Sequence, residues 1–215
     1  MSMTVTESAP GGIMGRLKNE TAELHVAAER SPLQAALVRG VLPREGYAAW
    51  LGQMLFVHRA LESALASAAK ESPVVGRVYQ DWQNTAPHVE ADLKFFGFDT
   101  AGAKPGAGGR EMIARIERVR KTNPVALLGM HYVLEGSKNG GKFIAKVVGR
   151  VYGLTQDGLR TLDPYGDAQR DRWAWFKSAM GAETFSPSEQ DAMVEEAKAM
   201  FNAVPAIGAD VMAGR

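Results

Sequence analysis

Helical spacing of apolar residues runs through most of this 215-residue chain, and the alternation typical of β-strands is nearly absent. The clearest example follows Pro43, a residue type that favours the first position of a helix. The apolar stripe of this segment is formed by Tyr47, Trp50, Leu51, Met54, Leu55, Leu61 and Leu65. Such a stripe predicts a long helix buried on one side. We therefore predict an all-α fold of roughly eight helices.

Helix boundaries predict one domain. We expect a disordered tail over residues 1–12, a folded domain over 13–204 and a C-terminal tail over 205–215. The first helix is expected from Ile13 to Glu29, and a long helix from Pro124 to Tyr152. The start of the last helix is predicted by a capping box with proline at its first position, Ser186-Pro187-Ser188-Glu189.

Composition excludes several classes of protein. The chain has 25 basic and 24 acidic residues, a formal charge of +1, so nothing favours nucleic acid or an anionic membrane as a partner. It has no cysteine, which excludes disulfides, thiolate metal sites and iron–sulfur clusters. No apolar run approaches the ~18 residues of a membrane helix, and the N-terminal residues lack the pattern of a signal peptide. We expect a cytoplasmic protein.

One face of the first predicted helix carries Lys18, Thr21, His25 and Glu29, spaced by three and four residues. This face adjoins the apolar side of the helix. An imidazole at the edge of an apolar wall is what an axial haem ligand requires. Glu29 is placed to accept a hydrogen bond from the other ring nitrogen, and Lys18 to reach a carboxylate at the haem rim. The same pattern also fits a partly exposed surface histidine.

Glycine interrupts the long helix that follows Pro124. Gly136, Gly140 and Gly141 each cost about 1 kcal/mol relative to alanine in a helix. Gly136 and Gly140 lie four residues apart and so expose main chain on one face. The pattern predicts a kink, or a flat partner against the backbone. A helix–helix crossing, or a loop between two shorter helices, would explain it equally well.

The other histidines and the familiar catalytic motifs add little. His58 lies on the apolar stripe and is interpreted as a core histidine, whereas His131, one turn before the glycines, is placed to reach a pocket there. The aromatic cluster at 173–176 is interpreted as core. No HExxH motif or serine nucleophile motif indicates a non-haem metal centre or a hydrolase.

Two stretches resemble haem oxygenases. The proximal-helix signature of that family is similar to Leu17-Lys18-x-x-Thr21-x-x-x-His25-x-x-x-Glu29. The distal helix of its bacterial branch resembles Tyr132-x-x-Glu135-Gly136-Ser137-x-x-Gly140-Gly141. A shorter match lies between them at 43–47, and another follows at 165–176, which resembles members associated with bacteriophytochromes. The resemblance covers residues 17–204, with its motifs in the order of the family.

This resemblance implies a single-domain fold in which haem lies between the first helix and a kinked, glycine-rich distal helix. His25 would be the proximal ligand of the iron and Glu29 its hydrogen-bond partner. Lys18 and Lys177 would pair with the haem propionates, with Arg172 as a competitor. Thr21 and Tyr132 would be further cofactor contacts.

On the distal side the resemblance implies backbone contacts from Gly136 and Gly140, and a catalytic role for these residues and Ser137. Many family members place an aspartate directly after the first distal glycine. This chain has Ser137 at that position, as in much of the bacterial branch, so water near the haem must be held otherwise. Asn139 stands where leucine or serine is more usual, and it would affect oxygen activation if it pointed at the iron.

The implied activity is oxidative cleavage of haem to biliverdin, carbon monoxide and ferrous iron. The reaction consumes O2 and electrons. Because the sequence has no dinucleotide or flavin fingerprint, an external electron donor such as a ferredoxin or a flavoprotein reductase is implied. We expect the protein to be a monomer or a weak dimer. Two alternatives remain open: a non-catalytic haem- or bilin-binding protein with the same fold, and a helical enzyme of the thiaminase type, which does not need the His25–Glu29 pair.

Overall fold

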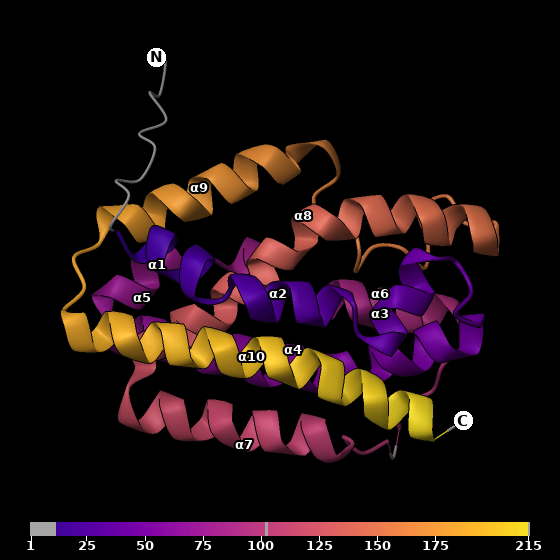
Figure 1. Cartoon of the computed structure of the whole chain (residues 1–215), viewed down its shortest axis with the longest axis horizontal. Helices are drawn as coiled ribbons and strands as arrows, with labels where there is room; N and C mark the ends of the chain where they lie inside the picture. The colour runs from indigo at the N-terminus through magenta and orange to yellow at the C-terminus, as the bar shows by residue number, and fades with distance from the viewer. Residues whose placement is uncertain (1–11, 102, 215) are drawn as a thin grey trace.

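The computed structural model describes residues 12–101 and 103–214 and forms helices joined by short connections, with no strand in these ranges (Figure 1). The α-helices are α1 Ile13–Glu20, α2 Ala22–Glu29, α3 Pro32–Val38, α4 Arg44–Glu71, α5 Pro73–Val78, α6 Ala86–Phe95, α7 Ala107–Thr122, α8 Leu127–Tyr152, α9 Gln169–Ala182 and α10 Pro187–Ala213. Three single turns of 3-10 helix are η1 Asp81–Gln83, η2 Pro124–Ala126 and η3 Gly166–Ala168. The predicted all-α class is confirmed. The tail expected over 1–12 lies, apart from Gly12, outside the described residues.

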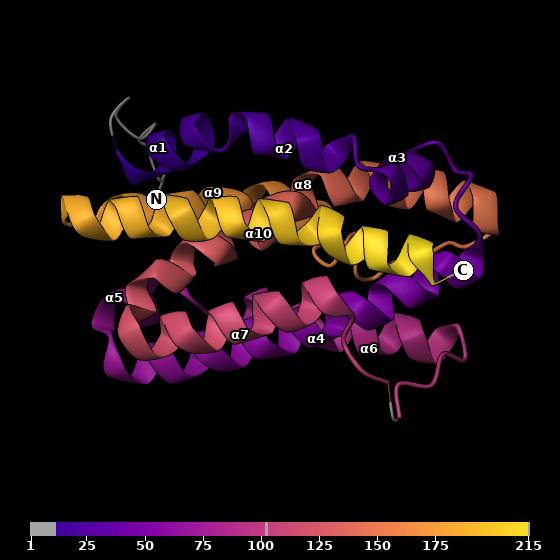
Figure 2. The same cartoon turned by 60° about the horizontal axis from the view of Figure 1, so that its bottom comes forward.

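The last helix, α10, runs through the middle of the molecule. It packs against α1, α2 and α3 on one side and against α4 and α7 on the other, and it also contacts α8 (Figure 2). The N-terminal helices α1, α2 and α3 therefore share one core with the last helix. No helix in the described ranges is both long and apolar enough to cross a membrane.

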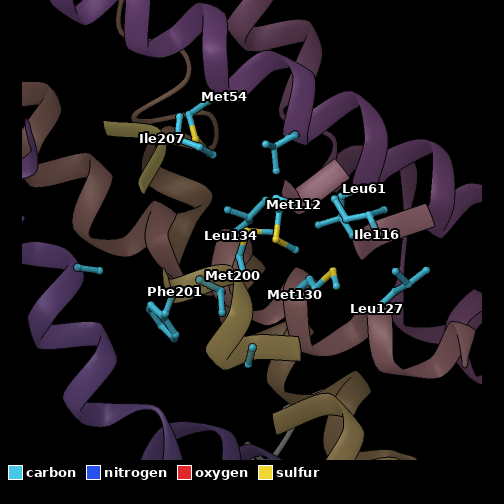
Figure 3. Close-up of a cluster of buried hydrophobic side chains, with 14 of the residues drawn as sticks. Met54, Leu61, Met112, Ile116, Leu127, Met130, Leu134, Met200, Phe201 and Ile207 are labelled. Atoms are coloured by element: carbon cyan, nitrogen blue, oxygen red, sulfur yellow. The ribbon is translucent and has the colours of Figure 1, made fainter. Parts of the chain in front are cut away.

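The core lies where α4, α7, α8 and α10 meet (Figure 3). Its side chains in that view include Met54, Leu61, Met112, Ile116, Leu127, Met130, Leu134, Met200, Phe201 and Ile207. Each is at most 9% exposed. Methionine supplies much of the contact because its unbranched chain fills irregular gaps between crossing helices. The stripe predicted on α4 is buried here.

The first predicted helix is divided at Thr21. The hydroxyl of Thr21 donates to the carbonyl of Leu17 at 2.6 Å, and the backbone of Thr21 has φ −111° and ψ 3°. A threonine hydroxyl that competes for this carbonyl disturbs the helix locally. Two short helices, α1 and α2, therefore replace the single helix expected from Ile13 to Glu29.

Residues 205–213, expected to lie in a C-terminal tail, continue α10 to Ala213. Pro205 lies inside this helix. Ile207 is fully buried and Val211 is 8% exposed, so the helix continues because its last turns still bury apolar side chains. The folded part of the chain is longer than predicted.

Helix α8 continues through its glycines, without the loop that remained an alternative. Its ribbon changes direction along its length (Figure 1), which agrees with the predicted kink. Gly129 and Gly141 lie directly against the carbonyls of Met193 and Leu162, so a side chain at either position would collide with main chain. Two of the glycines of α8 are thus explained by close packing.

Candidate functional site

The imidazole of His25, on α2, is packed on one side and open on the other. Its ring meets the ring of Phe201, on α10, edge-on, with centroids 5.5 Å apart and planes at 81°. The side chain of His25 is 54% exposed. The other three histidines are buried or half-buried, and all four are described. The ring is therefore accessible to a ligand while Phe201 limits its rotation.

Glu29 lies one turn after His25, and the two side chains approach without bonding. Oε1 of Glu29 is 3.7 Å from Nε2 of His25, beyond hydrogen-bond distance. The prediction that the two belong together agrees with this distance, but no hydrogen bond has formed. An exposed imidazole can rotate about its Cβ–Cγ bond, which would exchange the nitrogen nearer to Glu29.

Thr21 does not share the open surface of its predicted neighbours. It is 1% exposed, and its hydroxyl is bound to the carbonyl of Leu17. Lys18, by contrast, is exposed, and its ammonium has no ion-pair partner within the described ranges. On this face Lys18, His25 and Glu29 are open to a ligand and Thr21 is not.

Lys177 lies on α9, which packs against α1, the helix of Lys18. Lys177 is exposed and, like Lys18, has no ion-pair partner among the residues that the structure describes. Arg172, its competitor for a propionate, has its guanidinium 4.1 Å from the centroid of the Trp82 ring. Lys18 and Lys177, neither of which forms an ion pair within the described ranges, therefore lie on neighbouring helices. The guanidinium of Arg172 already packs on Trp82.

Gly136 and Gly140, on α8, have different surroundings. A Cβ built on Gly140 would meet no atom within 4 Å. A Cβ on Gly136 would lie 3.4 Å from the indole of Trp173, whose ring also packs on Tyr132 with centroids 5.9 Å apart. The backbone is thus open to a ligand at Gly140, while Trp173 lies against Gly136 and half-buried Tyr132.

The polar side chains between these glycines are bound to their own helix. The hydroxyl of Ser137 donates to the carbonyl of Leu134 at 2.8 Å. The amide nitrogen of Asn139 donates to the carbonyl of Gly136 at 2.9 Å, and its oxygen accepts from Gln169 at 3.1 Å. Asn139 is therefore occupied by protein groups. Ser137 is exposed, and its oxygen can still accept a hydrogen bond from water.

His58 and His131 are buried. His58 is 8% and His131 5% exposed, and burial, reinforced by the charge of Lys138, lowers the pKa of each to about 3. The core interpretation of His58 is confirmed. The ring of His131 packs between Tyr79 and Phe176, so its surroundings are aromatic.

A cavity of about 410 Å³ lies along the C-terminal half of α8. Its lining includes Lys142, Lys146, Arg150 and His88, and no residue of α1 or α2. It is therefore separate from the surface around His25. Within the described ranges no three histidine, aspartate or glutamate side chains gather as they would around a metal ion.

A family model described as "Heme oxygenase" matches residues 12–207 of this chain. The chain belongs to the haem oxygenase family. Among curated haem oxygenases, heme oxygenase 1 of Synechocystis sp. is 24% identical over 195 residues, which are 88% of this chain and 80% of that protein. Heme oxygenase 1 of Homo sapiens is 25% identical over 203 residues, 91% of this chain and 70% of the human protein.

Solved structures agree on the haem oxygenase fold. Heme oxygenase-1 from Synechocystis sp., in complex with heme, superposes with a TM-score of 0.86 at 21% identity and covers 94% of this chain and 93% of its own. Heme oxygenase from Leptospira interrogans gives 0.83 at 23% identity, covering 92% and 98%. A domain of unknown function with a heme oxygenase-like fold from Shewanella denitrificans gives 0.71 at 16% identity, covering 94% and 92%.

Sequence reasoning missed two features beside the candidate site residues. Phe201 contacts His25 from the far end of the chain, and no local spacing indicates that contact. The buried ion pair of Glu135 and Lys138 on α8 also went unassigned, although charges at i and i+3 on a helix are a recognisable signal.

Proposed function

We propose that this chain is a haem oxygenase that binds haem through His25 and opens the macrocycle to biliverdin, with release of carbon monoxide and ferrous iron. The observation that carries the proposal is an exposed histidine on α2 together with open backbone at Gly140 on α8. A flat ligand can approach the main chain where a Cβ would meet nothing. These residues fit a haem. The sequence Glu135-Gly136-Ser137 supports the bacterial branch.

Haem, when bound, supplies the redox chemistry with O2, and its own ring is the substrate. The proximal residues hold and orient it. His25 offers a neutral imidazole nitrogen, a ligand that does not push electron density as a thiolate does. Glu29 is close enough to accept from the other nitrogen once the imidazole turns, which would fix the tautomer. Lys18 and Lys177 provide free ammonium groups for the two propionates.

The distal residues shape the space above the ring and leave proton delivery to water. Gly136 and Gly140 allow close approach of main chain, and the exposed hydroxyl of Ser137 can hold a water molecule. Glu135, the one carboxylate of α8, is bound to Lys138 and Tyr165 instead. No strong side-chain acid of α8 is therefore free to protonate a bound ligand.

Electrons come from a separate protein in this proposal. A ferredoxin or a flavoprotein reductase is the class of donor that fits a chain without a flavin or dinucleotide fingerprint. An acidic donor would be attracted to exposed lysines such as Lys18 and Lys177 at the rim of the site.

A second candidate is a haem- or bilin-binding protein without turnover. It is supported by the likeness to the Shewanella domain of unknown function, because the same architecture occurs there without an assigned activity. The two candidates share the binding site and differ in whether the ring is opened.

Haem titration followed by reduction tests both. Haem should bind one-to-one with a Soret band, and His25→Ala should change that spectrum, whereas His88→Ala, a matched change at a half-buried histidine, should not. With O2 and ascorbate or a ferredoxin–reductase pair, the Soret band should fall, a broad red band should rise and carbon monoxide should be released. An unchanged spectrum in His25→Ala would overturn the ligand. Stable bound haem under reducing conditions would favour the binding protein.

A further inference from the structure

A buried ion pair lies beside the glycines of α8. Nζ of Lys138 donates to Oε2 of Glu135 at 2.7 Å, to the hydroxyl of Tyr165 at 2.7 Å and to the carbonyl of Gln83 at 2.8 Å. The hydroxyl of Tyr165 in turn donates to Oε2 of Glu135 at 3.2 Å. The two charged side chains are 5% and 0% exposed. All three N–H groups of the ammonium are therefore used inside the protein.

These bonds connect three segments that are distant in the chain. Lys138 and Glu135 belong to α8, Gln83 to η1, and Tyr165 to the connection that precedes η3. That connection is itself anchored, because the buried carboxylate of Asp92 on α6 accepts the amides of residues 160 and 161 at 3.0 and 2.7 Å. The ion pair therefore ties α8 to a fixed part of the molecule.

The ion pair lies behind the open surface of the helix. At about 100° per residue, its side of α8 faces away from Gly136 and Gly140. On the opposite side a Cβ at Gly140 would meet nothing within 4 Å. Glycine also weakens a helix relative to alanine. The three glycines thus make the segment 136–141 flexible, and no described side chain or main chain supports it at Gly140. The hydrogen bonds of Lys138 hold it on the opposite side of the helix.

Stability alone does not account for charges at this place. Two charges lose their hydration on burial, and apolar residues of similar size often serve stability as well or better. Apolar contacts, however, are non-directional, whereas three hydrogen bonds to three segments fix both the rotation and the height of a helix. A buried ion pair with directional hydrogen bonds is therefore better suited than apolar contacts to fix the position of the α8 main chain.

We propose that Lys138 is a positioning residue, which with Glu135 and Tyr165 fixes the glycine segment 136–141 for contact with haem. The inference rests on the proposed function and deepens it. Lys138 does not touch the ligand. It acts through the backbone of Gly136 and Gly140, and it sets where that backbone stands relative to the ring.

The double variant Glu135→Leu/Lys138→Leu removes both charges and keeps the site apolar. Its thermal midpoint should lie within about 4 °C of the wild type, since no unpaired charge is left. Amide hydrogen exchange of the haem-free protein should be about tenfold faster over 136–141 and unchanged in α4. The haem dissociation constant should rise about tenfold, with a changed ferric spin state. A matched control, Lys142→Met, removes a lysine one turn later that binds the carbonyl of Gly166 in η3, and it should change none of these.

Wild-type exchange and spectra in the double variant would overturn the inference and leave the proposed function intact. If the double variant does not fold, Tyr165→Phe replaces it, because it removes only the hydroxyl bonds of a half-buried side chain. The exchange over 136–141 should then rise less but measurably, and no rise would again contradict the inference. A wild-type protein that binds no haem would overturn the proposed function itself.

Discussion

Phe201, near the middle of the last helix, stands edge-on to the imidazole of His25 in the second helix, with ring centroids 5.5 Å apart. The packing at this contact limits how far the imidazole can swing, and it is made by a residue that is itself 9% exposed. The orientation of the candidate iron ligand therefore depends on the seating of α10 against α2.

Phe201→Leu should loosen the imidazole without unfolding the protein. Leucine keeps most of the apolar volume, so the free energy of unfolding should fall by less than about 1.5 kcal/mol. Haem affinity should fall about threefold to tenfold, because part of the ring orientation is lost. Phe185→Leu is the matched control, because Phe185 is also buried and the ring that meets His25 is that of Phe201. Equal losses of haem affinity in the two variants would contradict the contact's role.

Substitutions at Gly140 should separate folding from binding. With open space around its Cβ, Gly140→Ala should raise the free energy of unfolding by up to about 1 kcal/mol. Gly140→Leu should leave the circular dichroism of the haem-free protein unchanged but weaken haem binding strongly. Gly141→Ala should instead destabilise the fold, since its Cβ would collide with the carbonyl of Leu162. Unaltered haem affinity in Gly140→Leu would place the ligand elsewhere.

Acid should destabilise the protein through its buried histidines. Burial lowers the pKa of His58 and His131 from 6.5 to about 3, so between these values the unfolded chain binds protons that the folded chain does not. Stability therefore falls as the pH drops from about 6.5 towards 3, by up to about 1.4 kcal/mol per pH unit for each histidine. Half-buried Glu62 and buried Asp92, in which loss of hydration raises the pKa of the carboxyl group, act in the opposite direction.

Urea unfolding between pH 7 and 4.5 isolates this effect in His131→Phe. The phenyl ring can occupy the same aromatic surroundings, and Nε2 of His131 has no hydrogen-bond partner to lose. The free energy of unfolding of the variant should depend less steeply on pH than that of the wild type. The contributions of the acidic groups cancel when the two curves are subtracted. Met212→Ala, an exposed change that removes no titratable group, should keep the wild-type slope. Parallel curves for His131→Phe and wild type would contradict the assignment.

Removal of residues 205–215 should destabilise the whole domain. Loss of the buried side chains of Ile207 and Val211 alone corresponds to at least about 3 kcal/mol of unfolding free energy. Asp210→Ala should cost about 1 kcal/mol, because the carboxylate accepts the amide of Gly108 at 2.8 Å in the first turn of α7. Chemical denaturation measures both, with exposed Met212→Ala as the control. A truncated protein of wild-type stability would show these last turns to be dispensable.

Short sequence motifs correctly predicted those helix ends that are set by neighbouring residues. The capping box at Ser186 is present as predicted, with the amide of Glu189 bound to the serine hydroxyl and the glutamate bound to the serine amide. The break at Thr21 was missed, because one hydroxyl bond decides between a continuous and a divided helix. The helix beyond Pro205 was missed as well, since proline inside a helix is ordinarily unfavourable and only tertiary burial offsets it.

In the candidate site, too, the sequence predicted features with local causes and missed those that depend on tertiary packing. Helical spacing predicted Lys18, His25 and Glu29 on one open surface; all three are exposed, and His25 and Glu29 lie 3.7 Å apart. Spacing cannot reveal that Trp173 lies against Gly136, because that contact depends on how α9 packs on α8. The roles of these residues toward haem remain predictions that the experiments above address.

The central position of α10 has a consequence for biosynthesis. While the ribosome is still making the chain, α1, α2 and α3 have no last helix to pack against, and His25 has no Phe201 beside it. These N-terminal helices therefore stay partly exposed until α10 has been synthesised. If His25 is the haem ligand as proposed, haem added to a chain that still lacks α10 would find the histidine without Phe201 beside it, so we expect haem to be acquired after α10 is synthesised.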